Sequence, residues 1–192
     1  QRDRVLAELV PRAWQLVSRA AAAGINLTID AEESERLELS LDVFDALAER
    51  VAAEHPHWRG LGLAVQAYQT RSREVIDEVA RLARQHQLRL MVRLVKGAYW
   101  DAEIKRAQEL GLDAYPVFTH KNHTDVAYLA CARALLGHAP QLYPQFATHN
   151  ATTLAAVMQL ADSTELAAHG VAPAAAFEWQ RLHGMGEAVH RE

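Results

Sequence analysis

The 192-residue sequence lacks several features that would indicate specialised classes of protein. A single cysteine, Cys131, excludes a framework of internal disulfides and is typical of a reducing compartment. No apolar run approaches the roughly 18 residues that a membrane-spanning helix needs. The net charge is −4 and the basic residues do not form blocks, which argues against an electrostatic nucleic-acid binder. No H-E-x-x-H or C-x-x-C spacing suggests a metal site, so we expect no metal.

Residues 1–192 are long enough for one domain, because half of them are hydrophobic and can form a sizeable core. The start, Gln1-Arg2-Asp3-Arg4, is no signal peptide, and glutamine is an unusual first residue. We therefore expect the sequence to be a segment of a longer chain.

Apolar patterning predicts strands that alternate with helices about five times. The predicted strands are 25–29, 61–68, 88–95, 142–148 and 177–182, and helices are predicted between them, one of them capped by Thr124 and Asp125. This order indicates an α/β fold with parallel strands under helices. Since a (β/α)8 barrel typically needs about 250 residues, five βα units would form most of a barrel. A complete doubly wound sheet of five strands is the competing architecture, although no G-x-G-x-x-G follows the first strand.

Polar side chains gather at the carboxyl end of every predicted strand, whereas the strand bodies are apolar. The carboxyl ends of parallel strands share one edge of a sheet, where α/β proteins build their sites. The residues at these ends are Asp30; Gln66 and Tyr68; Arg93, Lys96 and Tyr99; Thr148, His149 and Asn150; and Gln180, Leu182 and His183.

Individual residues at this edge allow more than one interpretation. His149 and Asn150 could act as metal ligand or base, but a helix-capping pair is the commoner arrangement. Lys96 could form a Schiff base, neutralise a phosphate or be solvated. Asp30 opens an acidic stretch that is typical of a solvated helix N-terminus. Cys131 lies on an apolar helix face and is predicted to be inert core.

Several longer motifs closely resemble the proline dehydrogenase domain of bacterial proline utilization A. The clearest is Arg-Leu-Val-Lys-Gly-Ala-Tyr-Trp at 93–100, which continues to Gln108. Further similar stretches are 30–33, 36–40, 66–69, 115–119, 128–132, 143–150 and 182–187. The resemblance covers essentially the whole sequence.

The resemblance implies an α/β fold of the distorted (β/α)8 TIM-like barrel type that holds FAD without a covalent bond. Members of the family oxidise L-proline to Δ1-pyrroline-5-carboxylate by hydride transfer from proline C5 to flavin N5, the first step of proline catabolism. Their electrons then pass to a quinone at the membrane. The resemblance further implies a cytoplasmic protein, peripheral at the inner membrane face, and fusion to an aldehyde dehydrogenase domain.

Roles carried over by motif match place Arg93 at the reactive edge of the flavin, with Gln66 close by. The remaining flavin contacts implied are Val95, Lys96, Gly97, Ala98, Trp100, Thr119, His120, Lys121, Ala147, Thr148, His149, Asn150 and Gln180. Asp30, Tyr99 and Leu182 are implied to face the proline ring, which makes Arg93, Tyr99 and Asp30 the expected catalytic residues. A fixed, permanently charged guanidinium suits this role, because flavin reduction builds negative charge on the ring.

Two departures from the family pattern bear on function. The family binds the proline carboxylate with two adjacent arginines after the last strand and a lysine on an earlier strand, and residues 1–192 contain neither region. His120 stands where relatives often carry arginine. Two alternatives therefore stay open: an aldolase-like lyase that uses Lys96, and a catalytically incomplete barrel fragment that serves as scaffold.

Overall fold

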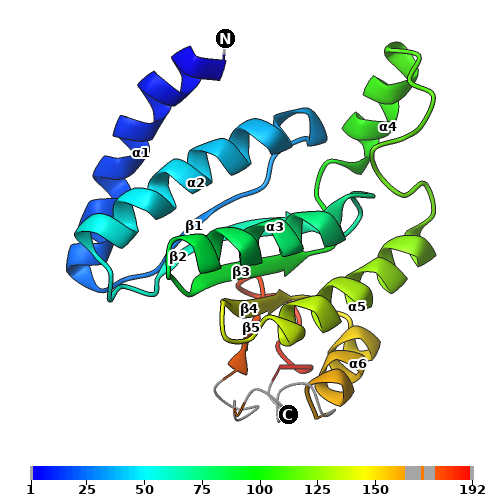
Figure 1. The fold of residues 1–192 in the computed structure, drawn as a ribbon. Helices are drawn as coiled ribbons and strands as arrows, with labels where there is room; N and C mark the ends of the chain where they lie inside the picture. The colour runs from blue at the N-terminus through cyan, green and yellow to red at the C-terminus, as the bar shows by residue number, and fades with distance from the viewer. Residues whose placement is uncertain (1, 163–169, 171–175, 191–192) are drawn as a thin grey trace.

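The computed structural model describes residues 2–162, 170 and 176–190. Its helices and strands alternate along the chain as the patterning predicts (Figure 1). They are α1 (Arg2–Ala23), β1 (Leu27–Ile29), a short 3-10 helix (Ser34–Arg36), α2 (Leu37–Glu54), β2 (Leu61–Gln66), α3 (Ser72–Gln85), β3 (Leu90–Val95), α4 (Trp100–Glu109), α5 (Lys121–Gly137), β4 (Leu142–Ala147), α6 (Ala151–Asp162) and β5 (Glu178–Gln180).

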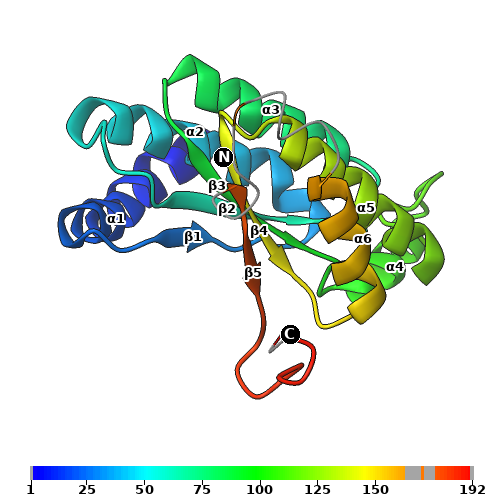
Figure 2. The same ribbon diagram turned by 90° about the horizontal axis from the view of Figure 1, so that it is seen from below.

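The five strands form one parallel sheet in the order β1-β2-β3-β4-β5. Each strand therefore pairs with its neighbours in the chain. Right-handed crossovers between consecutive parallel strands place their helices on the same face. Figure 2 shows α2, α3, α5 and α6 together on one side of the sheet, with the segment after β5 on the other. This arrangement excludes the doubly wound alternative, which requires helices on both faces.

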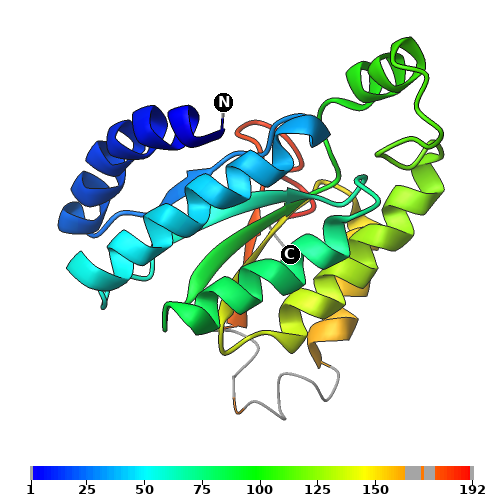
Figure 3. The same cartoon turned by 45° about the horizontal axis from the view of Figure 1, so that its top comes forward.

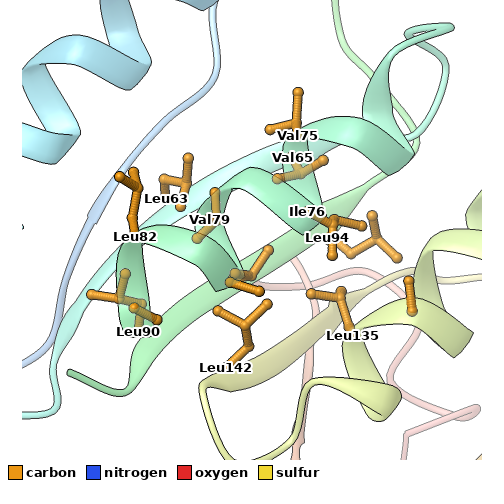
Figure 4. Packing of buried hydrophobic residues seen from close by; sticks show 14 of the residues in the cluster. Leu63, Val65, Val75, Ile76, Val79, Leu82, Leu90, Leu94, Leu135 and Leu142 are labelled. Carbon is orange, nitrogen blue, oxygen red and sulfur yellow. The ribbon is translucent and has the colours of Figure 1, made fainter. Parts of the chain in front are cut away.

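The core lies between the sheet and these helices. Alternate residues of the strands point into it, among them Leu63, Val65, Leu90 and Leu94, all buried. Figure 4 shows them packed against α3 and α5. The apolar spacing of α3 explains the fit, because its residues three and four apart share one face; Val75, Ile76, Val79 and Leu82 are all buried. None of the described helices is both long and apolar enough to cross a membrane.

The opposite face of the sheet is built from the other half of each alternation and is much more polar. Its members lie level with one another across the strands: Ala64 pairs with Arg93, Arg93 with Gln145, and Gln145 with Glu178. One layer further toward the carboxyl ends, Ala147 pairs with Gln180. We call this surface the inner face. It carries Arg93, the residue on which the predicted function depends.

Three expectations need comment. Five parallel strands are confirmed, but a closed barrel is not, since β1 and β5 are the edges of the described sheet. The predicted cap at Thr124 and Asp125 is wrong: α5 begins at Lys121, and Thr124 is buried inside the helix. Its partner Asp125 binds two lysines instead. The last strand, predicted at 177–182, is shorter in the structure and covers Glu178–Gln180.

Candidate active site at the carboxyl edge of the sheet

Arg93 stands at the centre of the inner face, held from two sides. Its Nε donates a hydrogen bond to Gln180 Oε1 at 2.8 Å, and its Nη1 donates to Asp30 Oδ1 at 2.7 Å. Arg93 is half-buried, whereas the Asp30 side chain is 77% exposed. These two bonds join the ends of β1 and β5 to β3. The structure therefore brings together three residues that the sequence predicts for the site.

The loop after β3 is fixed by two side chains of the neighbouring strand and its extension. Gln66 is buried at the end of β2; its Oε1 accepts from Ala98 N at 3.0 Å, and its Nε2 donates to Glu32 O at 2.9 Å. Tyr68 Oη accepts from Tyr99 N at 3.3 Å. Gln66, predicted as a flavin contact, thus also ties the Asp30 loop to the loop of Gly97 and Ala98.

Lys96, at the end of β3, pairs with Asp125 near the start of α5. Its Nζ donates to Asp125 Oδ1, while Lys121 Nζ donates to the other carboxylate oxygen at 2.7 Å. Hydrogen bonds from Lys121 and Lys96 hold the pKa of Asp125 below its usual value. The ion pair counts against an aldolase-like role for Lys96, because a Schiff base requires a free, unprotonated amine. The two ammonium groups sit beside the positive end of the α5 dipole, where anions bind well.

The segment before α5 is open to solvent. Trp100 is 43% exposed, and its indole N–H donates to Phe118 O at 2.9 Å. Thr119 and His120 are exposed, and His120 occupies the residue before the first turn of α5. The His120 ring contacts that of His123, with centroids 5.3 Å apart. Thr119 and His120 directly precede Lys121 in the chain, and their contact with flavin stays a prediction.

At the end of β4, Asn150 caps helix α6. Its Oδ1 accepts from Thr153 N at 2.9 Å, so the capping interpretation is confirmed. His149 Nε2 accepts from Leu182 N at 3.0 Å, which fixes the segment after β5 against β4. Thr148 is buried, and its hydroxyl accepts from Asn150 N at 3.2 Å. Leu182 itself is 64% exposed at the same edge.

Burial also changes the pKa values of Tyr68 and Cys131. Burial raises the pKa of Tyr68 to about 12, so its hydroxyl stays protonated at neutral pH. Cys131 is buried, which confirms its predicted core position, and burial raises the pKa of its thiol. Among residues 2–162, 170 and 176–190, no cluster of three His, Cys, Asp or Glu could hold a metal.

Sequence reasoning assigned no site role to two residues that contact the predicted ones. Glu178 binds Gln180 and Gln145, and Asp125 binds Lys96 and Lys121. Two signals could have found them. Glu178 precedes Gln180 by two residues and so shares its face of the strand. Asp125 lies four residues after Lys121, the spacing of a helical ion pair.

Known proteins are similar to this chain along its whole length. The proline dehydrogenase family matches residues 1–192. The bifunctional protein PutA of Escherichia coli K12 is 50% identical over all 192 residues, and that of Rhizobium meliloti is 47% identical. The match covers 100% of this chain but only 14% and 15% of those two proteins.

Solved structures agree in fold as well as in sequence. A crystal structure of a mutant proline utilization A from Bradyrhizobium japonicum has a TM-score of 0.90 and 55% identity, covering 99% of this chain and 18% of its own. Proline utilization A from Bdellovibrio bacteriovorus, inactivated by N-propargylglycine, has a TM-score of 0.88 and 31% identity, covering 98% of this chain and 19% of its own. Given a family match over every residue, this chain belongs to the proline dehydrogenase family.

Proposed function

We propose that this chain forms the flavin-binding part of an FAD-dependent enzyme that oxidises L-proline to Δ1-pyrroline-5-carboxylate. One observation carries the proposal: Arg93, in the longest motif shared with the family, is held on the inner face between Asp30 and Gln180. Two N–H groups of the guanidinium bind these side chains, and its other N–H groups could bind a ligand. Such a group is suited to orienting a planar ring that gains negative charge.

The donor set at the carboxyl edge fits FAD. Lys96 and Lys121, beside the N-terminus of α5, supply positive charge for a pyrophosphate. Arg93 supplies donors for the ring edge. The backbone of Gly97 runs close to the Tyr68 ring, an approach that only glycine allows. We assign the cofactor cradle to Gln66, Arg93, Val95, Lys96, Gly97, Ala98, Trp100, Thr119, His120, Lys121, Ala147, Thr148, His149, Asn150 and Gln180.

Asp30, Tyr99 and Leu182 are assigned to the substrate. They follow β1, β3 and β5 at the carboxyl edge of the sheet, the same edge that carries Arg93. The Bdellovibrio relative is inactivated by N-propargylglycine, a secondary amine with a carboxylate, as proline is. This chemistry supports a site that accepts N-substituted amino acids.

Each residue then has a simple task. FAD, when bound, supplies the hydride acceptor. Arg93 orients the ring and stabilises the charge that develops on it, while Asp30 balances the guanidinium and keeps it in place. Tyr99 and Leu182 shape the substrate side and limit the access of water. The chain therefore contributes alignment and electrostatics, and needs neither nucleophile nor metal.

The complete protein is proposed from the relatives. The chain spans about 14% of the length of the Escherichia coli protein, whose name calls it bifunctional. We infer a complete (β/α)8 barrel, fusion to an aldehyde dehydrogenase domain, quinone as electron acceptor and a cytoplasmic location peripheral to the membrane. The carboxylate-binding arginines of the family belong to regions outside residues 1–192.

The visible absorption spectrum of the purified holoenzyme, before and after addition of L-proline, tests the proposal. Oxidised-flavin bands that bleach with proline are the expected result. Glycine or D-proline at the same concentration serves as the control and should leave the bands unchanged. A folded protein that stays colourless after incubation with FAD would overturn the proposal, and an adduct trapped at Lys96 by borohydride would favour the lyase.

A further inference from the structure

Glu178 lies on the inner face next to Gln180, one of the two residues that bind Arg93. It occupies the first position of β5, paired with Gln145 of β4, and Gln180 follows two residues later on the same face. Glu178 is half-buried, and Gln145 is 2% exposed. The carboxylate is therefore surrounded by amides from two strands.

A single carboxylate oxygen serves both amides. Glu178 Oε1 accepts from Gln145 Nε2 at 2.8 Å and from Gln180 Nε2 at 2.8 Å. An ionised carboxylate can only accept hydrogen bonds, so each amide must turn its NH2 group toward it. The two ends of a glutamine amide are nearly identical in shape, and this contact decides which end faces which way.

The consequence for Arg93 follows from the geometry of Gln180. With its NH2 group committed to Glu178, the Gln180 amide presents its oxygen to Arg93, whose Nε donates to it at 2.8 Å. The reversed amide would place N–H groups against the N–H of Arg93, and the bond would be lost. The Gln145 amide is oriented in the same way. Its Nε2 donates to Glu178, whereas its buried Oε1 has no hydrogen-bond partner among the described residues that could fix the amide from the other end. Glu178 therefore fixes the orientation of both amides, because it accepts a hydrogen bond from the NH2 group of each.

We propose that Glu178 is a positioning residue that sets the orientation of the Arg93 guanidinium through the amide of Gln180. The proposal rests on the proposed function, because Arg93 acts on the flavin there. Among the described residues, Glu178 has hydrogen bonds to Gln145 and Gln180, and none to Arg93 or to the other expected cofactor residues. Its effect on the reaction must therefore pass through the amide and disappear when the guanidinium is absent.

The first experiment is a double-mutant cycle in the flavin-loaded holoenzyme, using Glu178→Gln and Arg93→Met. We expect Glu178→Gln alone to slow proline-dependent flavin reduction on the order of 10-fold, since small misplacements at a reacting centre cost up to roughly 100-fold. In the Arg93→Met background the same change should have no further effect. An equal fold-loss in both backgrounds would overturn the proposal. Glu8→Gln, on the exposed surface of α1, is the matched control.

A second readout does not depend on flavin. In protein labelled with 15N-arginine, the Nε–H signal of Arg93 is identified by its loss in Arg93→Met, and its hydrogen exchange is followed by NMR without cofactor. Exchange several-fold faster in Glu178→Gln than in the wild type supports the proposal; equal exchange contradicts it. A wild type that fails to bleach with proline would refute the proposed function alone, because the exchange measurement still reports the contact.

Discussion

The ring of Tyr68 lies directly against the backbone of Gly97, so that a Cβ at position 97 would be 2.5 Å from carbons of that ring. Gly97 has φ of 142°, a conformation that other residues rarely adopt. Position 97 therefore needs glycine for two reasons: the backbone angle, and the lack of space for a Cβ above the Tyr68 ring.

We predict that Gly97→Ala costs more stability than Gly111→Ala. Both glycines have positive φ, but nothing lies within 4 Å of a Cβ at Gly111. The control should lose about 1 kcal/mol from strain alone. Gly97→Ala should lose about 1–3 kcal/mol of strain plus the cost of displacing Tyr68. Urea unfolding of the two variants measures the difference, and equal losses would show that the ring contact does not matter.

Tyr68 predicts a specific loss of stability at high pH. Burial raises its pKa from 10.0 to about 12 in the folded protein, so folding favours the neutral phenol. This contribution is complete below pH 10 and falls as the pH rises toward about 12. Tyr68→Phe has no such group, and should lose less stability than the wild type between pH 10 and about 12. The comparison cancels the other two tyrosines with raised pKa values, Tyr128 and Tyr143, because both proteins contain them.

Arg93→Ala should damage the reaction far more than the fold. The partner carboxylate, Asp30, is 77% exposed, and such ion pairs contribute only about 0–1 kcal/mol. Loss of a donor that stabilises developing charge typically costs roughly 100-fold or more in rate. Stopped-flow bleaching with proline gives the rate, and a thermal melt gives the stability. If the loss in activation free energy were no larger than the loss in the free energy of unfolding, the proposed catalytic role of Arg93 would be wrong.

Lys121→Met should weaken FAD binding without affecting riboflavin. Lys121 is exposed at the start of α5, and its charge is assigned to the pyrophosphate, which riboflavin lacks. We expect a several-fold rise in the FAD dissociation constant at low ionic strength, which shrinks as salt screens the charge. Lys105→Met on the exposed side of α4 is the control. Equal weakening of FAD and riboflavin would contradict the assignment.

The position of each predicted strand end could be read from the sequence because alternation has a strict period. In β3, Leu90, Val92 and Leu94 turn to the core while Arg93 turns to the inner face, as their spacing predicts. The gathering of Asp30, Arg93 and Gln180 then follows from parallel strands alone.

What the sequence did not reveal depends on contacts between distant segments. Asp125 was predicted to cap a helix because its type and place suit a cap, but Lys96, from another element, binds it instead. Glu178 was passed over because one acidic residue in a short strand gives no signal until Gln145 and Gln180 lie beside it. Barrel closure depends on strands beyond the five in the described sheet.

Figure 3 shows the helices in front of the sheet and the segment after β5 behind it. Because every strand pairs with its chain neighbour, the sheet can grow one strand at a time as the polypeptide is synthesised. Most of the buried core needs only β1 to β4, whereas the bond between Arg93 and Gln180 spans 87 residues and needs β5. The guanidinium of Arg93 is thus bonded to Gln180 only after β5, the last of the five described strands, has joined the sheet. A chain that stalls before β5 is added would retain a packed core, but its Arg93 would be held only by Asp30.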